Sequence, residues 1–402
     1  MAPTGIPNGT AHSESSQASA TFGAGIGISP LPPFLSSSAS ALPPTIAILS
    51  LGEMGMGIAS LLVKYSYPVI TNLEGRSAKT KARAALAGVQ EVSFEELIGK
   101  ADVLLSILPP AEALPLVKMA SKVLKAKAAS GNKRRLFYMD LNAISPSSAR
   151  EMDTIFSGMD VIFIDGGIIG FPPRQLADGN WFRPSITTSG PVISEPWFEH
   201  FASLIKITHI SPDIGAASGL KMCFGSIYKG LAAVATQAYI TAKNLGVLEH
   251  LRGHLLEYFP GMTPIIENSI LGEQRKAYRW IREAEEIEAT FAADGGWERD
   301  LFKGVADVFH VVAEKTTLEK ESKADVEEVV REICLSVRRK TSKRGDKTDV
   351  PFRVTIYLPD VTYLQQSRQT DDRQLIFGQR NNVRLVKSNS RCRLSDDPVE
   401  AM

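Results

Sequence analysis

The 402-residue chain lacks most features that would stabilise it covalently or tie it to a metal, a membrane or a nucleic acid. Its three cysteines, Cys223, Cys334 and Cys392, lie far apart without a CxxC pair. This argues against a zinc site or a disulfide framework and suits a reducing compartment. His250 and His254 stand four residues apart but lack the glutamate of an HExxH motif, so we predict no metal site. No apolar run reaches the roughly 18–20 residues of a membrane helix, and a net charge of +1 argues against nucleic-acid binding.

The first 44 residues also lack targeting signals. They are rich in Ser, Ala, Pro and Gly, and Glu14 carries their only formal charge. A secretory signal peptide would have a basic n-region, and a mitochondrial transit peptide would have arginines. We interpret residues 1–44 as a disordered leader and expect a cytoplasmic protein.

Strand and helix patterns alternate from Thr45 to about residue 212. "TIAILSLG" is a β-branched run ending in glycine, and "IASLLVKY" after it has apolar residues at helical spacing. Similar pairs follow along this part of the chain. The alternation predicts an α/β fold, with a doubly wound parallel Rossmann sheet covered by helices on both faces over residues 45–212.

Beyond residue 212 the patterns become helical. A proline-free, apolar-rich pattern runs from Ala216 to about Leu245, and we predict an all-α substrate and dimerisation domain over residues 213–322. Within it, the acidic "EAEEIEA" is expected to be an exposed helix face, with a pair between one of its acids and Arg279 or Arg282 as the alternative. Residues 323–402 show few apolar residues at any period, apart from a strand-like run at 352–359, and predict a poorly structured tail.

The stretch Ser50-Leu51-Gly52-Glu53-Met54-Gly55 joins the first strand to the first helix. A dinucleotide-binding turn needs a tight reversal, a bare backbone where the pyrophosphate approaches, and a small residue where helix meets strand. Gly52 and Gly55 supply the last two, while Ser50 stands where a first glycine is usual. We predict that backbone amides near Met54 bind a pyrophosphate, helped by the helix dipole. The alternative is a buried strand–helix turn without a ligand.

The end of the second strand bears on the choice of coenzyme. An acid there binds the ribose 2′-hydroxyl of NAD, whereas arginine accepts the 2′-phosphate of NADP. The sequence offers both Glu74 and Arg76, with Ser77, Lys79 and Lys81 close behind. The extra cations and the hydroxyl favour NADP, and NAD remains the alternative.

Several segments together have a recognisable pattern: "SLGEMGMGIA", "DVLLSILP", "DLNAISP", "FIDGGIIGFPP", "GAASGLKMCFGSIYKG", "KAYRWIREAEEIEATF" and "FKGVADVF". They resemble the β-hydroxyacid dehydrogenase superfamily, which includes 6-phosphogluconate dehydrogenase and 3-hydroxyisobutyrate dehydrogenase. The more specific resemblance is to a branch described only as 6-phosphogluconate-dehydrogenase-like. It covers about Thr45 to Lys315 and neither end of the chain.

The resemblance implies a Rossmann domain, a helical second domain and NAD(P)-linked hydride transfer at a carbon that bears a hydroxyl group. It places Lys221 at the family's catalytic lysine and Leu108 and Pro109 beside the nicotinamide. A lysine partly desolvated beside a cationic ring has its pKa lowered and can act as a general acid/base. The alternative for Lys221 is a lysine on the helix surface. The resemblance also implies a homodimer in which two helical domains build the site.

Three departures from the family pattern stand out. Gly225 replaces an asparagine that holds substrate. The 6-phosphogluconate enzymes have a histidine and a proton-donating glutamate nearby, where this chain has Phe224 and Tyr228. Ile169 and Phe171 replace a serine and a glycine of the substrate loop. Genuine 6-phosphogluconate decarboxylation is therefore not expected.

Two residues that share a helix face with Lys221 are candidates to replace the polar groups that are missing from the family pattern. Tyr228 would donate a proton and Lys229 would bind an anionic group, helix packing and a solvated surface being their alternatives. Asn142 would hold substrate or the nicotinamide amide, with a loop cap as its alternative. The predicted substrate-binding residues are Asn142, Gly167, Ile168, Gly170, Tyr228 and Lys229. The predicted coenzyme-binding residues are Ser50, Leu51, Gly52, Glu53, Met54, Gly55, Glu74, Arg76, Ser77, Leu108 and Pro109.

Together these features predict an NADP-preferring oxidoreductase for a small hydroxy acid or a related carbonyl compound, with no nucleic-acid or membrane partner. One alternative is an imine reductase-like enzyme, since that group shares the fold but alters the lysine position. The other is a coenzyme-binding scaffold without turnover, which relaxed selection at Ser50, Gly225 and Ile169 would fit.

Overall fold

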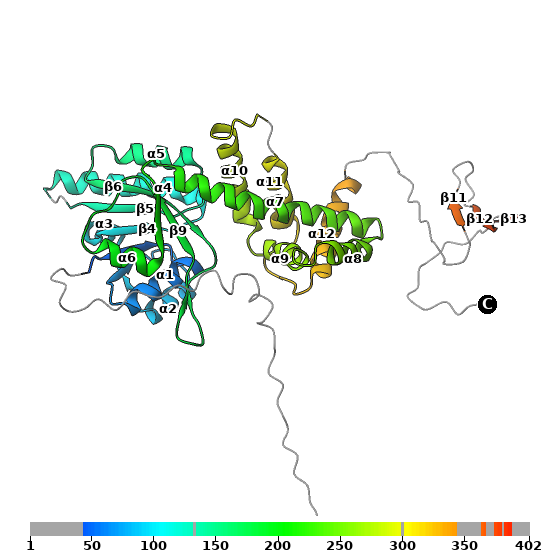
Figure 1. Cartoon of the computed structure of the whole chain (residues 1–402), viewed down its shortest axis with the longest axis horizontal. Helices are drawn as coiled ribbons and strands as arrows, with labels where there is room; N and C mark the ends of the chain where they lie inside the picture. Colours follow the sequence, from blue (N-terminus) through cyan, green and yellow to red (C-terminus); the bar gives the residue numbers. More distant parts are fainter. Residues whose placement is uncertain are drawn as a thin grey trace, which may run out of the picture. The chain divides into compact units, whose positions relative to one another are not determined.

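The computed structural model describes residues 43–131, 134–298 and 301–343, with short strands at 363–366, 374–379 and 382–387. Most of the predicted leader, residues 1–42, and the strand-like run at 352–359 lie outside the described residues. The chain divides into two units, Met1–Arg338 and Arg339–Met402. The first unit holds an α/β half and a helical half joined by one long helix (Figure 1).

The α/β half is built on an eight-stranded sheet with the order β10-β9-β6-β5-β4-β1-β2-β3. Two very short strands, β7 and β8, form a separate hairpin between β6 and β9. The strands are β1 (Ile46–Leu49), β2 (Val69–Thr71), β3 (Gln90–Glu91), β4 (Val103–Ser106), β5 (Leu136–Asp140), β6 (Val161–Ile169), β7 (Arg174–Gln175), β8 (Trp181–Phe182), β9 (Ser185–Ser189) and β10 (Ile207–Ser211). The helices are α1 (Glu53–Lys64), α2 (Ala78–Leu86), α3 (Phe94–Lys100), α4 (Pro110–Ala129), α5 (Pro146–Phe156) and α6 (Phe198–Ile205).

The central strands are apolar along their whole length because helices bury both faces of the sheet. Every residue of β1 and β4 is buried, and the two strands pair in parallel register, with Ile46 opposite Val103 and Leu49 opposite Ser106. Parallel strands that are buried on both faces have continuous apolar sequences, and this pattern predicted them here. The predicted doubly wound Rossmann architecture is confirmed. Two edge strands break the parallel order, since β9 runs antiparallel to β6 and β10 pairs with β9 in parallel.

The strand order reverses between β1 and β4, and ligands of doubly wound sheets bind at the carboxyl ends of the strands at such a point. The turns after β1, β2 and β4 therefore converge where a coenzyme is expected. The boundary predicted after residue 212 falls between β10 and the long helix α7.

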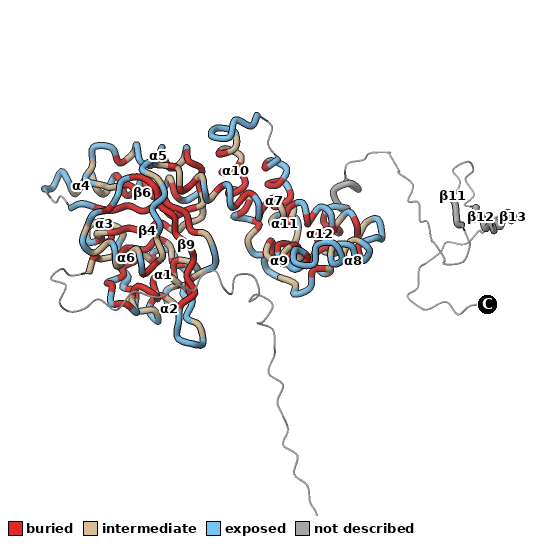
Figure 2. The backbone as a smooth tube through the Cα atoms, viewed as in Figure 1, coloured by how far each residue is buried: buried red, intermediate tan, exposed pale blue. Residues whose placement is uncertain are grey.

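The helical half is a bundle around α7. Its helices are α7 (Ala216–Asn244), α8 (Leu248–Tyr258), α9 (Thr263–Glu273), α10 (Ala277–Ala293), α11 (Phe302–Lys315) and α12 (Val326–Lys343). Buried side chains from all six helices form one core, separate from the two cores on either face of the sheet (Figure 2). In the described residues, no helix combines the length and apolarity that crossing a membrane requires.

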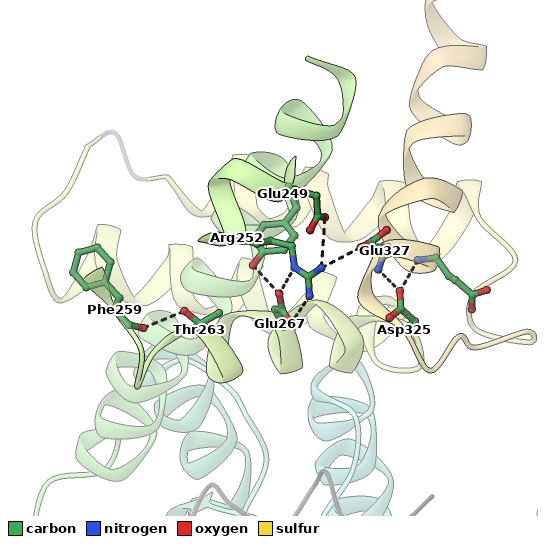
Figure 3. Close-up of polar contacts among 9 residues, drawn as sticks. Glu249, Arg252, Phe259, Thr263, Glu267, Asp325 and Glu327 are labelled. Carbon is green, nitrogen blue, oxygen red and sulfur yellow. Dashed lines mark hydrogen bonds and ion pairs between the residues drawn. The ribbon is translucent and has the colours of Figure 1, made fainter. Parts of the chain in front are cut away.

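One arginine ties four of these helices together. Arg252 on α8 contacts Glu267 on α9 through Nε at 2.8 Å and Glu327 on α12 through Nη1 at 3.0 Å (Figure 3). Tyr239 on α7 donates to the same Glu267 at 3.3 Å. Asp325 accepts from the backbone N–H of Glu327 at 2.7 Å and so caps the start of α12. The network fixes α12 against the bundle.

The predicted end of the helical domain at residue 322 is wrong. Five residues of α12 are buried in the bundle core: Val326, Val329, Val330, Ile333 and Cys334. Their spacing follows the i, i+3, i+4 and i+7 pattern of an amphipathic helix, and charged residues between them masked that pattern in the composition. The prediction of a poorly structured tail therefore fails for α12. In the second unit, described by itself, β11 (Tyr363–Gln366), β12 (Gln374–Gln379) and β13 (Asn382–Lys387) form an antiparallel sheet.

Candidate coenzyme and catalytic site

The glycine turn has the geometry of a pyrophosphate cradle. An added Cβ at Gly55 would lie 2.0 Å from the carbonyl oxygen of Ser50, so only glycine lets α1 pack this closely on the turn. A Cβ at Gly52 would meet nothing within 4 Å, which leaves its backbone open towards the carboxyl end of the sheet. No side chain caps the start of α1 at Gly52, so the first N–H groups of the helix are available to an anion. The turn therefore fits a dinucleotide, while Leu51 anchors it in the core.

A hollow of about 300 Å³ beside this turn brings the second-strand candidates together. Glu74, Arg76 and Leu108 all line it. Arg76 lies 3.7 Å from Glu112 on α4, and both side chains are largely exposed, so the guanidinium is free to turn towards a ligand. A larger hollow of about 640 Å³ lies where the strands begin, at the opposite edge of the sheet. That edge is not where doubly wound folds bind coenzymes.

Ser77 has a local structural role. Its Oγ accepts from the backbone N–H of Thr80 at 3.2 Å and so caps the start of α2. The predicted contact between Ser77 and a coenzyme stays a prediction. Pro109 occupies the N-cap position of α4, directly after Leu108.

Asn142 is held in place by groups of two strand ends. Its side-chain oxygen accepts from the backbone N–H of Leu108, and its side-chain NH₂ donates to Ser106 and to Asp140, both at 2.8 Å. These bonds use both N–H donors of the amide and one lone pair of its oxygen, so the structure favours the loop-cap interpretation over direct substrate binding. Asn142 thereby fixes the β4–α4 turn that carries Leu108 and Pro109. Burial raises the pKa of Asp140 to about 7, against which hydrogen bonds from Asn142 act.

Asp165 on β6 caps the long helix that carries the catalytic candidate. Its carboxylate accepts from the backbone N–H groups of Gly215 and Ser218, each at 3.0 Å, and from the Ser189 hydroxyl at 2.9 Å. A buried carboxylate at a helix N-terminus is favoured by the helix dipole. This cap attaches α7 to the sheet one turn before Lys221.

Lys221 lies against the end of β6, the segment predicted from the sequence to bind substrate. Its ammonium donates to the backbone carbonyl of Ile168. A Cβ at Gly167 would lie 2.8 Å from the Cβ of Lys221, so glycine is what lets the helix approach the loop. Burial, assisted by the positive charge of Lys229, lowers the pKa of Lys221 to about 8. The lysine can therefore both give and take a proton near neutral pH. Gly170, at the end of the loop, has a φ of +124°.

Lys229 lies beside Gly225, the position at which the resemblance implies an asparagine. Its Nζ lies 3.5 Å from where a Cβ of Gly225 would be, and it forms an ion pair with Glu283 on α10 at 2.6 Å. Both partners are nearly buried. Although burial raises the pKa of Glu283, Lys229 and Arg279 outweigh it and lower the pKa overall. The absence of a side chain at Gly225 thus admits an ammonium group in place of an amide.

Two further cations complete the cluster from the start of α10. Arg279 lies 3.9 Å from Glu283. Burial and the charge of Arg279 lower the pKa of Lys276, whereas the charges of Glu53 and Glu283 raise it. The cluster holds more positive than negative charge.

Tyr228 takes a different place from Lys229. It packs edge-to-face on Trp280, with ring centroids 5.9 Å apart, and burial and the charge of Glu273 raise its pKa. This is the helix-packing interpretation, and a role for Tyr228 as proton donor stays a prediction.

Comparisons with known proteins agree with this geometry. Residues 45–129 match the family model described as NADP oxidoreductase, coenzyme F420-dependent, and residues 242–312 match a domain of unknown function, DUF1932. A 3-hydroxyisobutyrate dehydrogenase from Mycobacterium tuberculosis superposes with a TM-score of 0.52 at 20% identity, over 72% of this chain and 99% of that one. One from Salmonella typhimurium gives 0.50 at 17% identity, over 71% and 99%. An uncharacterised protein of Methanothermus fervidus is 26% identical over 60% of this chain and 90% of its own length.

The chain has the 3-hydroxyacid dehydrogenase fold. This fold is the one that the resemblance to the β-hydroxyacid dehydrogenase superfamily implied. The matched NADP oxidoreductase model spans the glycine turn and Arg76, so residues 45–129 of the α/β half are similar to the NADP-binding domain of an oxidoreductase.

The sequence analysis did not predict the burial of two acids on α10. The "EAEEIEA" segment was expected to be exposed, yet Glu283 and Glu286 are buried. Glu286 accepts from the backbone N–H of Ser145 at 2.9 Å and from the Ser148 hydroxyl at 3.0 Å, which ties α10 to the α/β half. The alternative of a pair with arginine is confirmed, since Arg279 lies 3.9 Å from Glu283 and Arg282 lies 2.6 Å from Glu286. Among the described residues, no group of three or more potential metal ligands occurs.

Substituting the two turn glycines should separate coenzyme binding from folding. Gly52→Ala places a methyl group in open space, so the melting temperature should change little while affinity for NADPH falls at least tenfold. Gly55→Ala forces the Ser50 carbonyl to move and should cost stability as well. Thermal melts and NADPH fluorescence titrations of both variants test this. Unchanged NADPH affinity in Gly52→Ala would contradict pyrophosphate binding at this turn.

Proposed function

We propose that the chain is an NADP-linked oxidoreductase that interconverts a hydroxyl group and a carbonyl group on a small anionic molecule. The observation that carries this proposal is the position of Lys221, a partly desolvated amine with a pKa of about 8 beside the substrate loop of an NAD(P)-binding domain. A hydroxy acid or a related carbonyl compound is the substrate class that the fold suggests.

Lys221 performs the proton transfer in both directions. In oxidation, neutral Lys221 takes the proton of the substrate hydroxyl as a general base. In reduction, protonated Lys221 gives a proton to the carbonyl oxygen as a general acid. The bound nicotinamide would accept or supply the hydride. The Ile168 carbonyl orients the ammonium between transfers.

The cationic cluster selects an anionic substrate. Lys229, Lys276 and Arg279 surround Glu283, which neutralises only part of their charge. A carboxylate or phosphate on the substrate would complete the charge balance, and the low dielectric of the site strengthens that attraction. Lys229 would take the place of the missing asparagine.

Arg76 supports the choice of NADP over NAD, with Glu74 as the opposing group in the same hollow. A charge-assisted contact to the 2′-phosphate contributes about 1.5–3 kcal/mol. Arg76→Ala should therefore weaken NADPH binding about 10- to 100-fold and leave NADH binding nearly unchanged. Fluorescence titration with both coenzymes measures this, with Arg135→Ala, which removes a distant surface ion pair, as control. Equal losses for both coenzymes would contradict a 2′-phosphate contact.

A substrate screen separates this activity from its two rivals. Hydroxy acids, oxo acids and cyclic imines are tested with NADPH or NADP⁺ by absorbance of the nicotinamide. Turnover of imines alone would favour an imine reductase-like enzyme. Tight NADPH binding without turnover of any substrate would favour a scaffold.

A further inference from the structure

The start of α5 has the serine of a capping box but not its acid. Ser145 is the N-cap residue, and its Oγ accepts from the backbone N–H of Ser148 at 3.3 Å. In a capping box, the residue three positions after the cap is Glu or Gln, and its side chain reaches back to the backbone N–H of the cap residue. Here that position is Ser148. The N–H of Ser145, a residue that is 1% exposed, therefore needs an acceptor from outside the helix.

Glu286 on α10 supplies the missing acid. Its Oε2 accepts from the backbone N–H of Ser145 at 2.9 Å and from the Ser148 hydroxyl at 3.0 Å, while its Oε1 accepts from Arg282 at 2.6 Å. The side chain of Glu286 is buried, and a carboxylate at a helix N-terminus is favoured by the helix dipole. The cap of α5 in the α/β half is thus completed by a residue of the helical half.

The capped turn also contacts the side of the α/β half where the nicotinamide is expected. Three residues before Ser145, the side-chain oxygen of Asn142 accepts from the backbone N–H of Leu108. Between them, Ile144 is buried in a core of the sheet, whereas Ala143 packs against the core of the helical bundle. This short segment therefore contacts both halves, and a shift at Ser145 is passed on to the turn that carries Leu108.

The other end of the link is the cationic cluster. Glu283 lies one helix turn before Glu286 on α10 and forms the ion pair with Lys229 at 2.6 Å. Because both acids belong to one uninterrupted helix, their positions are fixed relative to each other. The charge of Lys229 in turn lowers the pKa of Lys221. A single helix thus connects the cap of α5 with the charged groups around the proposed catalytic lysine.

We propose that Glu286 is a positioning residue, which holds the cationic cluster at a fixed distance from the nicotinamide side of the α/β half. This role rests on the proposed function, in which the cluster binds the anionic group of the substrate. The carboxylate of Glu286 takes no part in the proton transfer. It closes the cap of α5 and so keeps α10 against the Asn142 turn. A misplacement of about 1 Å between reacting groups can cost about 10²-fold in rate.

Two substitutions of Glu286 separate positioning from stability. Glu286→Ala removes the acceptor of the cap and should lower kcat about 100-fold on the best substrate of the screen. KM and NADPH affinity should change little, because the cluster and the glycine turn both remain. Glu286→Gln keeps an oxygen that accepts from Ser145 and should recover most of the lost kcat, although it loses the charge paired with Arg282. A purely structural role would lower the melting temperature and leave the kcat of the folded enzyme unchanged, which would overturn the proposal.

Asp294→Asn is the matched control, because Asp294 also links α10 to α5. It forms an ion pair with Arg150 at 3.1 Å, in which both side chains are largely exposed. Exposed ion pairs contribute little, so the kcat of this variant should equal that of the wild type. A loss of kcat as large as that in Glu286→Ala would mean that any weakening of this interface slows the reaction. That result would contradict a specific role for Glu286.

Hydrogen exchange of the full chain tests the link without any substrate. The backbone N–H groups of Ser145 and Leu108 are both hydrogen-bonded, so both should exchange slowly in the wild type. In Glu286→Ala both should exchange about tenfold faster, measured by mass spectrometry of the peptides that contain them, whereas Glu286→Gln and Asp294→Asn should protect both. Faster exchange at Ser145 alone, or at neither, would overturn the proposal.

The two experiments also distinguish this proposal from the proposed function. A chain that turns over no substrate in the screen would contradict the oxidoreductase activity. The exchange of the Leu108 N–H in Glu286→Ala would still decide whether Glu286 holds the turn on the nicotinamide side.

Discussion

Replacing Lys221 by methionine is expected to lower kcat by about 10²–10⁴-fold, the usual contribution of a positioned general acid or base. Methionine keeps most of the packing against Gly167 but cannot transfer a proton. NADPH affinity should change little, since the contacts proposed for the coenzyme lie at the β1–α1 turn. Steady-state kinetics on the best substrate of the screen, with NADPH titration of the same variant, measures both.

The wild-type pH profile should report the same lysine. Oxidation requires neutral Lys221, so its rate should rise with pH and level off above about 8, the pKa of Lys221. Reduction requires the protonated form, so its rate should fall as pH rises through the same value. Lys221→Met should abolish both dependences in this range.

Lys243→Met is the matched control, because Lys243 lies in the last turn of the same helix. Its kcat should equal that of the wild type. A Lys221→Met enzyme with full activity would contradict the proposed proton transfer and leave the scaffold interpretation.

Replacing Glu283 by glutamine is expected to destabilise the protein by about 3–5 kcal/mol, the usual effect of removing one partner from a buried ion pair. The ammonium of Lys229 is nearly buried and would lose its carboxylate at 2.6 Å. Because Glu283 raises the pKa of Lys221, its removal should also move the pH midpoint of the reaction to lower pH. Chemical denaturation and pH–rate profiles measure the two effects.

Glu285→Gln removes an exposed acid of the same helix, paired with Arg282, and should change stability by no more than about 1 kcal/mol. The double variant Lys229→Met/Glu283→Leu should regain most of the stability lost in Glu283→Gln, because apolar residues can replace a buried pair. An unshifted pH midpoint in Glu283→Gln would mean that the cluster does not act on Lys221.

The part of the fold that could be predicted from the sequence is the part whose signals are local. The β1 strand, the glycine turn and α1 follow one another within twenty residues, and each has its own periodicity or backbone requirement. The uninterrupted pattern of α7 likewise fixed its ends to within one residue. The turn forms although Ser50 replaces the usual first glycine, because the position that has no room for a side chain is Gly55.

The remainder depends on contacts between distant segments. In the sequence, Glu286 is one acid among several on an amphipathic helix. Only its hydrogen bonds to Ser145 and Ser148, over 130 residues away, show that it is buried and links α10 to the start of α5. Lys276 belongs to the cationic cluster through the charges of Arg279 and Glu283 on α10 and of Lys229 on α7, a grouping that no local pattern predicts. Asn142 is a substrate candidate by sequence, but its amide forms hydrogen bonds to Ser106, Leu108 and Asp140 at the ends of β4 and β5, contacts that only the folded sheet brings together.

A crystal structure of the chain with NADP⁺ tests the central claim most directly. The account predicts the diphosphate on the backbone amides of Gly52 to Met54, the 2′-phosphate near Arg76, and the nicotinamide ring between Leu108 and Lys221. A structure with the coenzyme bound elsewhere, or with none bound at saturating concentration, would contradict it.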